Sequence, residues 1–257
     1  MGRIIAIANQ KGGVGKTTTS VNLAASLATE GHNVLLVDVD PQANGSSGVG
    51  VEKNTIEFGI YHALLGEVTL DDILRPTSLE RLWVAPASRD LAGAALELAE
   101  MDEGQLRLKT LLSSVRDRFD YIVIDCPPSL DLLTVNGLTA ADSILIPVQC
   151  EYYAMEGLSD LVNTIQMVKD NLNEHLVIEG ILFTMYDPRN NLAHQVVNEV
   201  RGHFEDKVFE TMIPRNVRLS EAPSHGQPCI LYDGASRGSQ SYLALAKELK
   251  ARLAAAA

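Results

Sequence analysis

Cysteine is scarce in this chain of 257 residues, which contains only Cys126, Cys150 and Cys229. The three lie far apart, and no C-x-x-C pair occurs among them. Zinc sites and iron–sulfur centres are normally recognised by such paired cysteines, so the spacing gives no local support for either kind of site. We expect three reduced, partly buried thiols.

Long apolar runs are also missing from the sequence. No run approaches the roughly 20 residues that a membrane-spanning helix needs, and the N-terminus enters the first expected strand without a signal-peptide pattern. Hydrophobic residues still make up 46% of the chain, which is ample for a substantial core. No Pro/Ser-rich linker or internal repeat divides it. We therefore expect one cytoplasmic domain over residues 1–257, with no membrane association.

The chain also lacks an excess of positive charge. The formal net charge of -12 argues against a polyanion as partner. The charge is unevenly distributed, however: residues 180–257 carry nine Lys and Arg against eight Asp and Glu, whereas residues 1–179 carry twelve against 25. Any surface for nucleic acid is therefore expected in the C-terminal third.

Glycine is concentrated in one segment, residues 9–18, whose sequence is N-Q-K-G-G-V-G-K-T-T. The segment follows an apolar run at 4–8 and precedes a helical pattern. Its three glycines let backbone N–H groups converge on a phosphate, while the helix N-terminus and Lys16 add favourable charge. Thr17 is then placed to ligate Mg²⁺. The pattern predicts a strand, a phosphate-binding loop and a helix.

This loop departs from the standard P-loop spacing in two ways. Gln10 stands where the standard pattern has its first glycine, and Lys11 is a second lysine. A chance glycine cluster in a turn is the alternative, but Lys16, the two threonines and the flanking elements all agree with phosphate binding. Because Lys11 lies on the other lip of the loop from Lys16, a role toward an incoming partner is sensible. A solvated surface lysine is the alternative.

Apolar runs and helical patterns alternate along the whole chain. Strands are expected at 4–8, 33–37, 82–85, 121–125, 143–148, 177–185 and 208–213. Helices are expected at 17–30, 58–65, 90–100, 105–118, 154–171, 192–204 and 239–253, and the Gly/Ser-rich stretch 43–53 is expected to be a mobile loop beside the phosphate site. This alternation predicts an α/β fold with a doubly wound, mostly parallel sheet and helices on both faces.

Three aspartates stand at the ends of expected strands: Asp38, Asp40 and Asp125. Ligands in open α/β sheets bind beyond these carboxyl ends. Asp125 suits a Walker B role in the Mg²⁺ shell, and one of Asp38 and Asp40 can contact that shell while the other orients the attacking water. Carboxylates that only cap loops are the alternative for Asp40 and Asp125.

Four segments together resemble one family. They are N-Q-K-G-G-V-G-K-T-T, V-L-L-V-D-V-D-P-Q-A-N, Y-I-V-I-D-C-P-P-S-L and I-P-R-N-V-R-L-S-E-A-P-S, which occur in this order from residue 9 to beyond residue 220. They resemble the ParA/Soj family of deviant-Walker chromosome-partitioning ATPases, of the chromosomal Soj type. The likeness spans essentially the whole chain.

The resemblance implies a role for each matching residue. Lys11 would reach the phosphates of a partner's nucleotide in an ATP-bound homodimer, as an arginine finger does, a device worth roughly 10³ to 10⁵ in rate. Asp40 would position the hydrolytic water. The phosphates of the chain's own ATP or ADP would be held by Gly12, Gly13, Val14, Gly15, Lys16, Thr17 and Thr18, the Mg²⁺ by Thr17, Asp38 and Asp125, and the adenine by Met185, Pro214 and Asn216.

The same resemblance implies partners for the assembled dimer. Arg189 and Arg218 correspond to basic residues of a surface that binds double-stranded DNA nonspecifically, and a ParB/Spo0J-type protein would stimulate hydrolysis. The protein would then associate with the nucleoid. From the residues alone the arginines could equally be ordinary solvated surface. Phosphate contacts predict salt-dependent, sequence-independent binding.

Other functions remain as alternatives. A MinD-like membrane ATPase would need a C-terminal amphipathic membrane helix, but the stripe formed by Tyr242, Leu245, Leu249 and Leu253 lacks a dense basic face, so we expect it to pack against the sheet. An iron–sulfur carrier ATPase would need paired cysteines. A plasmid-type ParA would need room before residue 9 for an extra DNA-binding motif. A nucleotide-switched scaffold without turnover is the non-enzymatic alternative.

Overall fold

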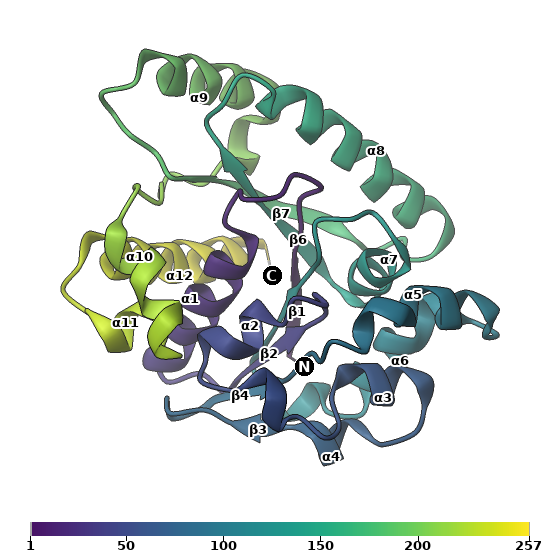
Figure 1. Ribbon diagram of the computed structural model, residues 1–257. Coiled ribbons are helices and arrows are strands. Elements are labelled where there is room, and N and C mark those ends of the chain that lie inside the picture. The colour runs from purple at the N-terminus through teal and green to yellow at the C-terminus, as the bar shows by residue number, and fades with distance from the viewer. Residues whose placement is uncertain (1, 257) are drawn as a thin grey trace.

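A seven-stranded sheet forms the centre of the computed structural model, which describes residues 2–256 (Figure 1). The strand order is β3-β4-β2-β5-β1-β6-β7, and among these described strands only the two-residue β3 runs antiparallel to its neighbour. The strands are β1 Arg3–Ile7, β2 Val34–Asp38, β3 Arg75–Pro76, β4 Leu82–Ala85, β5 Tyr121–Asp125, β6 Ser143–Gln149 and β7 Val177–Thr184. The predicted doubly wound, mostly parallel sheet is confirmed.

Helices surround this sheet. The α-helices are α1 Lys16–Thr29, α2 Asn44–Gly48, α3 Ile60–Leu65, α4 Leu70–Ile73, α5 Leu91–Glu100, α6 Arg107–Ser113, α7 Leu132–Ala140, α8 Ala154–Asn171, α9 Asn191–Phe204, α10 Val217–Glu221, α11 Cys229–Tyr232 and α12 Arg237–Ala256. Short 3-10 turns lie at Lys53–Thr55, Gly104–Leu106, Arg116–Arg118, Glu205–Lys207 and Ala222–His225. Among the helices of residues 2–256, none combines the length and apolar character needed to cross a bilayer.

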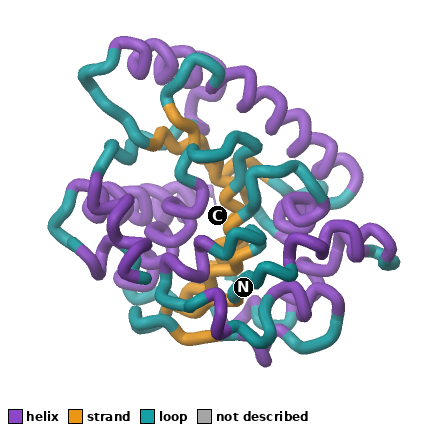
Figure 2. Tube along the Cα trace, in the orientation of Figure 1, coloured by secondary structure: helices purple, strands orange, loops and turns teal. Residues whose placement is uncertain are grey.

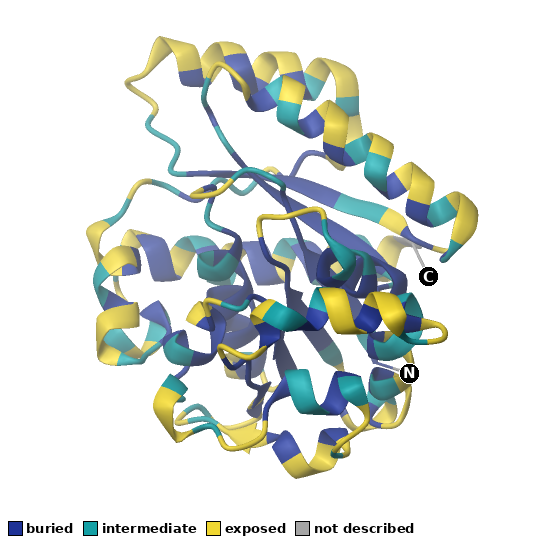
Figure 3. Ribbon diagram, turned by 45° about the vertical axis from the view of Figure 1, so that its right-hand side comes forward, coloured by how far each residue is buried: buried dark blue, intermediate teal, exposed yellow. Residues whose placement is uncertain are grey.

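Two hydrophobic cores lie on opposite faces of the sheet. Along β1, Ile4 and Ala6 belong to one core and Ile5 and Ile7 to the other, as the two-residue period of a strand requires. Helices α3 to α9 cover the first face, and α1, α10, α11 and α12 cover the second. Figure 3 shows the buried strands between helices whose outer faces are exposed. Burial on both faces explains why these strands are nearly continuous apolar runs.

The C-terminal helix α12 packs on the second face. Its apolar stripe of Tyr242, Leu245 and Leu249 is buried in that core, and Leu253 packs against it partly buried. The expectation that this stripe faces the protein interior is therefore confirmed.

The expected strand at 208–213 is wrong. The segment touches β7 through two hydrogen bonds, from Phe209 N to Ile181 O and from Ile213 N to Phe183 O, each 2.9 Å. Between these two bonds the segment advances by four residues while β7 advances by two. The register is lost because the successive N–H groups of residues 210 and 211 both donate to the side chain of Glu248 in α12. Successive N–H groups of a regular strand point to opposite sides.

Other differences concern helices (Figure 2). The stretch 43–53 contains the short helix α2 and a 3-10 turn, and the expected helix at 105–118 is divided into two 3-10 turns and α6. Helices α4, α7, α10 and α11 were not expected. Helix α7 begins after Asp131, whose side chain accepts hydrogen bonds from the N–H groups of Leu133 and Thr134. Its apolar residues are spread around the helix and alternate with Thr134, Asn136 and Thr139, so helical periodicity gave no signal.

Candidate functional site

A cavity of about 580 Å³ opens beyond the carboxyl ends of the central strands. The loop after β1 forms its floor, at the point where the chain leaves β1 toward β2 while β6 lies on the other side of β1. Among the predicted site residues, those that line the cavity are Gly12, Gly13, Gly15, Lys16, Thr17, Thr18, Asp40, Met185, Pro214 and Asn216. Segments nearly 200 residues apart in sequence therefore meet at one site.

The loop is shaped by two glycines in the left-handed region. Gly13 has φ +76° and Gly15 has φ +85°, conformations that side chains oppose. Val14 does not line the cavity: its side chain is buried, and its carbonyl oxygen accepts a 2.8 Å hydrogen bond from the Thr184 hydroxyl at the end of β7. Val14 thus ties the loop to β7.

Lys16 lies at the start of α1 with only 6% of its surface exposed. Its ammonium donates a 2.9 Å hydrogen bond to the carbonyl oxygen of Lys11. Burial lowers the pKa of Lys16, against the opposing effect of Asp125 and Asp40. A desolvated cation among loop amides is suited to holding phosphate oxygens.

Lys11 is not among the cavity-lining residues. Its ammonium forms a 2.5 Å ion pair with Glu151, and both side chains are partly exposed. The backbone at Lys11 is fixed separately, because its N–H donates to Asn9 Oδ1 over 2.9 Å. The structure therefore brings Lys16 into the cavity and pairs the side chain of Lys11 with Glu151, outside the cavity lining.

Asp38 and Asp125 are buried side by side behind the cavity, where β2 and β5 place them opposite each other in register. Asp38 accepts hydrogen bonds from the backbone and hydroxyl of Ser46, at 2.6 and 2.7 Å. Burial raises the pKa of both carboxyl groups, and the charge of Asp38 raises that of Asp125 further. A Cβ at Gly45 would lie 3.0 Å from Asp38 and 3.2 Å from Asp125, so the backbone packs directly against both.

The residues around Asp125 fit a divalent cation. Its Oδ1 accepts a 2.8 Å hydrogen bond from Ser20, whereas its Oδ2 is buried and has no hydrogen-bond partner within the described chain. Thr17, whose hydroxyl is the expected first ligand, lies close enough to Asp125 to act against the rise in the pKa of that carboxyl. Hard cations prefer such oxygen donors. Between residues 2 and 256, no cluster of three or more His, Cys, Asp or Glu offers a purely protein-built metal site.

Asp40 reaches the cavity itself. Its Oδ1 accepts a 2.9 Å hydrogen bond from the N–H of Gln42, which leaves Oδ2 available for a water. The turn that follows is strained, since buried Ala43 has φ +50°. Left-handed residues other than glycine concentrate at functional sites. Met185, on the opposite wall, also has φ +50°.

Met185, Pro214 and Asn216 line the cavity from a part of the chain far from the glycine loop in sequence. Tyr186 pairs with Pro214 in an isolated parallel bridge, which joins the end of β7 to the segment before α10. Asn216 caps α10 by accepting a 2.9 Å hydrogen bond from the N–H of Arg218. Sequence reasoning did not identify the additional lining residues Thr184, Arg215 and Tyr242. Arg215 lies inside the I-P-R-N motif, whereas Tyr242 gave no signal beyond core periodicity.

Arg189 and Arg218 lie outside the cavity, and each is paired with carboxylates of its own chain. Arg189 contacts Asp187 through two hydrogen bonds, of 2.9 and 2.7 Å, which hold the pKa of that carboxyl well below its usual range. Arg218 contacts Glu221 at 2.8 Å and Asp233 at 3.2 Å. Both side chains are exposed, so an incoming phosphate can compete with these partners.

The strand, glycine-rich loop and helix, with carboxylates at the adjacent strand ends, define a P-loop ATPase. Residues 2–178 match the family described as AAA domain. The chain is 59% identical over 251 residues to the sporulation initiation inhibitor protein Soj of Bacillus subtilis, across 98% of this chain and 99% of that protein. It is 58% identical to the chromosome partitioning protein ParA of Myxococcus xanthus, across 98% and 89%. The chain therefore belongs to the Soj/ParA family of chromosome-partitioning ATPases.

A solved structure shows the same fold. Cobyrinic acid a,c-diamide synthase from Mycobacterium smegmatis, with bound ADP and magnesium, superposes with a TM-score of 0.85 at 36% sequence identity. The match covers 96% of this chain and 93% of that one. A related fold thus holds a magnesium nucleotide.

Proposed function

We propose that this protein is an ATP-driven dimer switch. ATP and Mg²⁺ bind in the cavity, two copies close around the nucleotides, and the closed homodimer binds double-stranded DNA without sequence preference. Hydrolysis to ADP, slow until DNA and a ParB-type partner stimulate it, reopens the dimer. Support comes from family membership and from a relative of this fold that holds ADP and magnesium.

The observation that carries the proposal is the position of the two loop lysines. The phosphate cradle already has a buried cation, Lys16, and the loop amides. Lys11 belongs to the same loop, but its partly exposed ammonium pairs with Glu151 and does not line the cavity. A partly exposed cation of the loop can reach a nucleotide held by a facing subunit. The site is then completed by a second copy of the chain.

Each remaining polar group has a place in this chemistry. Asp40 lies in the cavity with one carboxylate oxygen free of its loop hydrogen bond, so it positions the attacking water. Thr17 and Asp125 would hold the Mg²⁺, which would supply positive charge to neutralise the phosphates. Asp38 is committed to Ser46, which assigns it to holding the strand end beside Asp125.

The proposal is tested by measuring DNA binding against nucleotide state. DNA retention and sedimentation are compared with ADP, ATP and a non-hydrolysable ATP analogue, across a salt series. We expect dimerisation and DNA binding with the triphosphates alone, and binding that weakens steeply as salt rises. Equal DNA binding with ADP and ATP would contradict the switch.

Two alternatives are separated by further measurements. A nucleotide-switched scaffold without turnover would dimerise with ATP but release no phosphate, even with DNA and partner present. A MinD-like membrane ATPase would bind anionic vesicles when ATP is present. The burial of Tyr242, Leu245 and Leu249 argues against that function, because the stripe that would enter the lipid lies in the core.

A further inference from the structure

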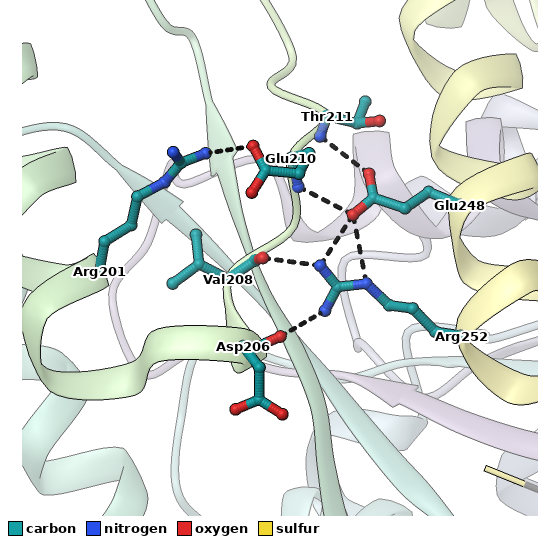
Figure 4. A network of polar contacts seen from close by, with 7 residues as sticks. All are labelled: Arg201, Asp206, Val208, Glu210, Thr211, Glu248 and Arg252. Carbon is teal, nitrogen blue, oxygen red and sulfur yellow. Dashed lines mark hydrogen bonds and ion pairs between the residues drawn. The ribbon is translucent and has the colours of Figure 1, made fainter. Parts of the chain in front are cut away.

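Glu248 on α12 binds the chain segment that leads to the cavity (Figure 4). Its carboxylate accepts hydrogen bonds from the successive backbone N–H groups of Glu210 and Thr211, each 2.8 Å long. Burial opposes ionisation of this group, but these bonds and the neighbouring Arg252 outweigh it and lower the pKa of Glu248. The ionised side chain therefore substitutes for the strand partner that this segment lacks.

Arg252, one helical turn further along α12, binds the same segment beside Glu248. Its guanidinium donates to the carbonyl oxygens of Asp206 and Val208, at 2.9 and 2.7 Å, and to Glu248 at 2.8 Å. It also lies 4.3 Å from the ring centroid of buried Phe209. Together the two side chains satisfy four backbone groups of residues 206–211, as Figure 4 shows.

The clamped segment continues directly into one wall of the cavity. Ile213 donates to Phe183 O and accepts from Tyr186 N, at 2.9 and 3.0 Å, and the next residues, Pro214 and Asn216, line the cavity. This wall therefore depends on a stretch of irregular backbone. Besides their hydrogen bonds to β7, residues 206–211 take most of their backbone hydrogen-bond partners from α12, so these contacts set the position of the segment.

Helix α12 also contacts the helix that follows the phosphate loop. The hydroxyl of Tyr242 lies 3.1 Å from that of Thr19 in α1, and Tyr242 lines the cavity. Further along, Lys250 forms an ion pair with Glu30 at the end of α1. The same helix thus contacts α1 and the clamped segment through different residues, and these contacts can be removed separately.

We propose that Glu248 and Arg252 are positioning residues that set the affinity of the cavity for the base of the nucleotide. This inference rests on the proposed function, because it assumes that a nucleoside triphosphate binds with its base against Pro214 and Asn216. The pair contacts the chain that carries the wall and stays away from the phosphate loop. Its loss should affect recognition of the base and spare recognition of the phosphates.

The test compares ATP with inorganic tripolyphosphate, which carries the phosphates and lacks the base. Dissociation constants for both are measured with Mg²⁺ on the full chain and on Glu248→Ala and Arg252→Ala. We expect ATP binding to weaken by about tenfold in each variant, since charge-assisted hydrogen bonds no longer order the wall. Tripolyphosphate binding should stay within about twofold of the original protein.

Lys250→Ala is the matched control, because it removes a charged contact of the same helix to α1 instead of to the clamped segment. It should leave the ratio of the two dissociation constants unchanged. If Glu248→Ala does not fold, Glu248→Gln retains the side-chain shape and one acceptor, and should give a smaller loss of ATP affinity. Circular dichroism checks folding at the assay temperature.

Parallel weakening of ATP and tripolyphosphate, or unchanged ATP affinity, would overturn the inference and leave the proposed function intact. The same holds if Lys250→Ala changes the ratio as much as the two variants. An original protein that binds ATP no more tightly than tripolyphosphate would overturn the base-binding wall itself. That result would contradict the proposed function as well.

Discussion

Asp125 is held under unfavourable conditions in the protein without ligands. It is buried opposite Asp38, one of its carboxylate oxygens has no hydrogen-bond partner in the described chain, and burial raises its pKa. A buried carboxylate of this kind costs stability unless a cation approaches it. Under the proposed function, Asp125 therefore lowers the stability of the protein without ligands and raises its affinity for magnesium nucleotide.

Asp125→Asn should separate these two effects. Without ligands, at a pH above the raised pKa of Asp125, the variant should be more stable by about 1 to 3 kcal/mol, since it removes a poorly compensated buried charge. Its Mg²⁺-dependent affinity for ADP should fall, because the cation shell loses an anionic group. Denaturant unfolding and nucleotide titration with and without Mg²⁺ measure the two. A variant that is destabilised, or that binds the magnesium nucleotide normally, would contradict this role.

Asp40→Ala tests the assignment of the catalytic carboxylate. Because Asp40 lies in the cavity and is not needed to hold the loop glycines, ATP-dependent dimerisation and DNA binding should persist. Hydrolysis should slow by roughly 10² to 10⁴, the usual contribution of a residue that activates water. Phosphate release measured beside DNA retention gives both results. Normal hydrolysis would remove Asp40 from the mechanism.

At the level of elements, the sequence predicts most of what depends on local pattern. The apolar strands that end at Asp38 and Asp125, the glycine loop and the helix after it all lie where periodicity and turn chemistry place them. Their meeting at one cavity follows from the rule for parallel sheets. These features are local in sequence or are imposed by topology.

The features that sequence could not predict depend on contacts between distant residues. Residues 208–213 have the apolar composition of a strand, but Glu248 draws two successive N–H groups away from β7. The ion pair of Lys11 with Glu151 joins residues 140 positions apart. No local pattern contains such information, and neither the clamp nor the resting position of Lys11 could be inferred.

Gly180→Ala tests how closely the clamped segment packs on β7. A Cβ at this position would lie 2.5 Å from the ring of Phe209 and 3.0 Å from the carbonyl oxygen of Lys207. The segment would have to move, and we expect a loss of about 1 to 3 kcal/mol in the free energy of unfolding. Gly202→Ala in α9 is the control, since a Cβ there meets nothing within 4 Å. Equal effects of the two would contradict the close packing.

The whole molecule carries a net charge of -12, yet the proposed function requires it to bind DNA. The arginines predicted to do so, Arg189 and Arg218, are each neutralised by carboxylates of their own chain. Phosphates must therefore compete with Asp187, Glu221 and Asp233. We therefore expect a single subunit to bind DNA weakly. The dimer should bind DNA much more tightly, because it doubles the number of phosphate contacts.

Changing these pairs should move DNA affinity in opposite directions. Arg218→Glu should weaken DNA binding and make it less dependent on salt, with nucleotide affinity unchanged, because a phosphate contact is lost. Asp187→Asn should strengthen binding a few-fold, because it frees Arg189 from an exposed pair of modest strength. Both are measured by DNA retention of the ATP-bound protein across a salt series.

Asp170→Asn is the control for net charge. It removes the same single negative charge, but at the C-terminal end of α8. This end of α8 leads into the start of β7, whereas Asp187 follows the end of β7, at the opposite end of the sheet. If the ion pair of Asp187 with Arg189 matters, Asp187→Asn should raise DNA affinity more than Asp170→Asn does at every salt concentration. Equal gains from the two would show that only total charge governs DNA affinity, and would remove Arg189 from the binding surface. A gain confined to Asp187→Asn would place the DNA beside the loop that joins β7 to α9.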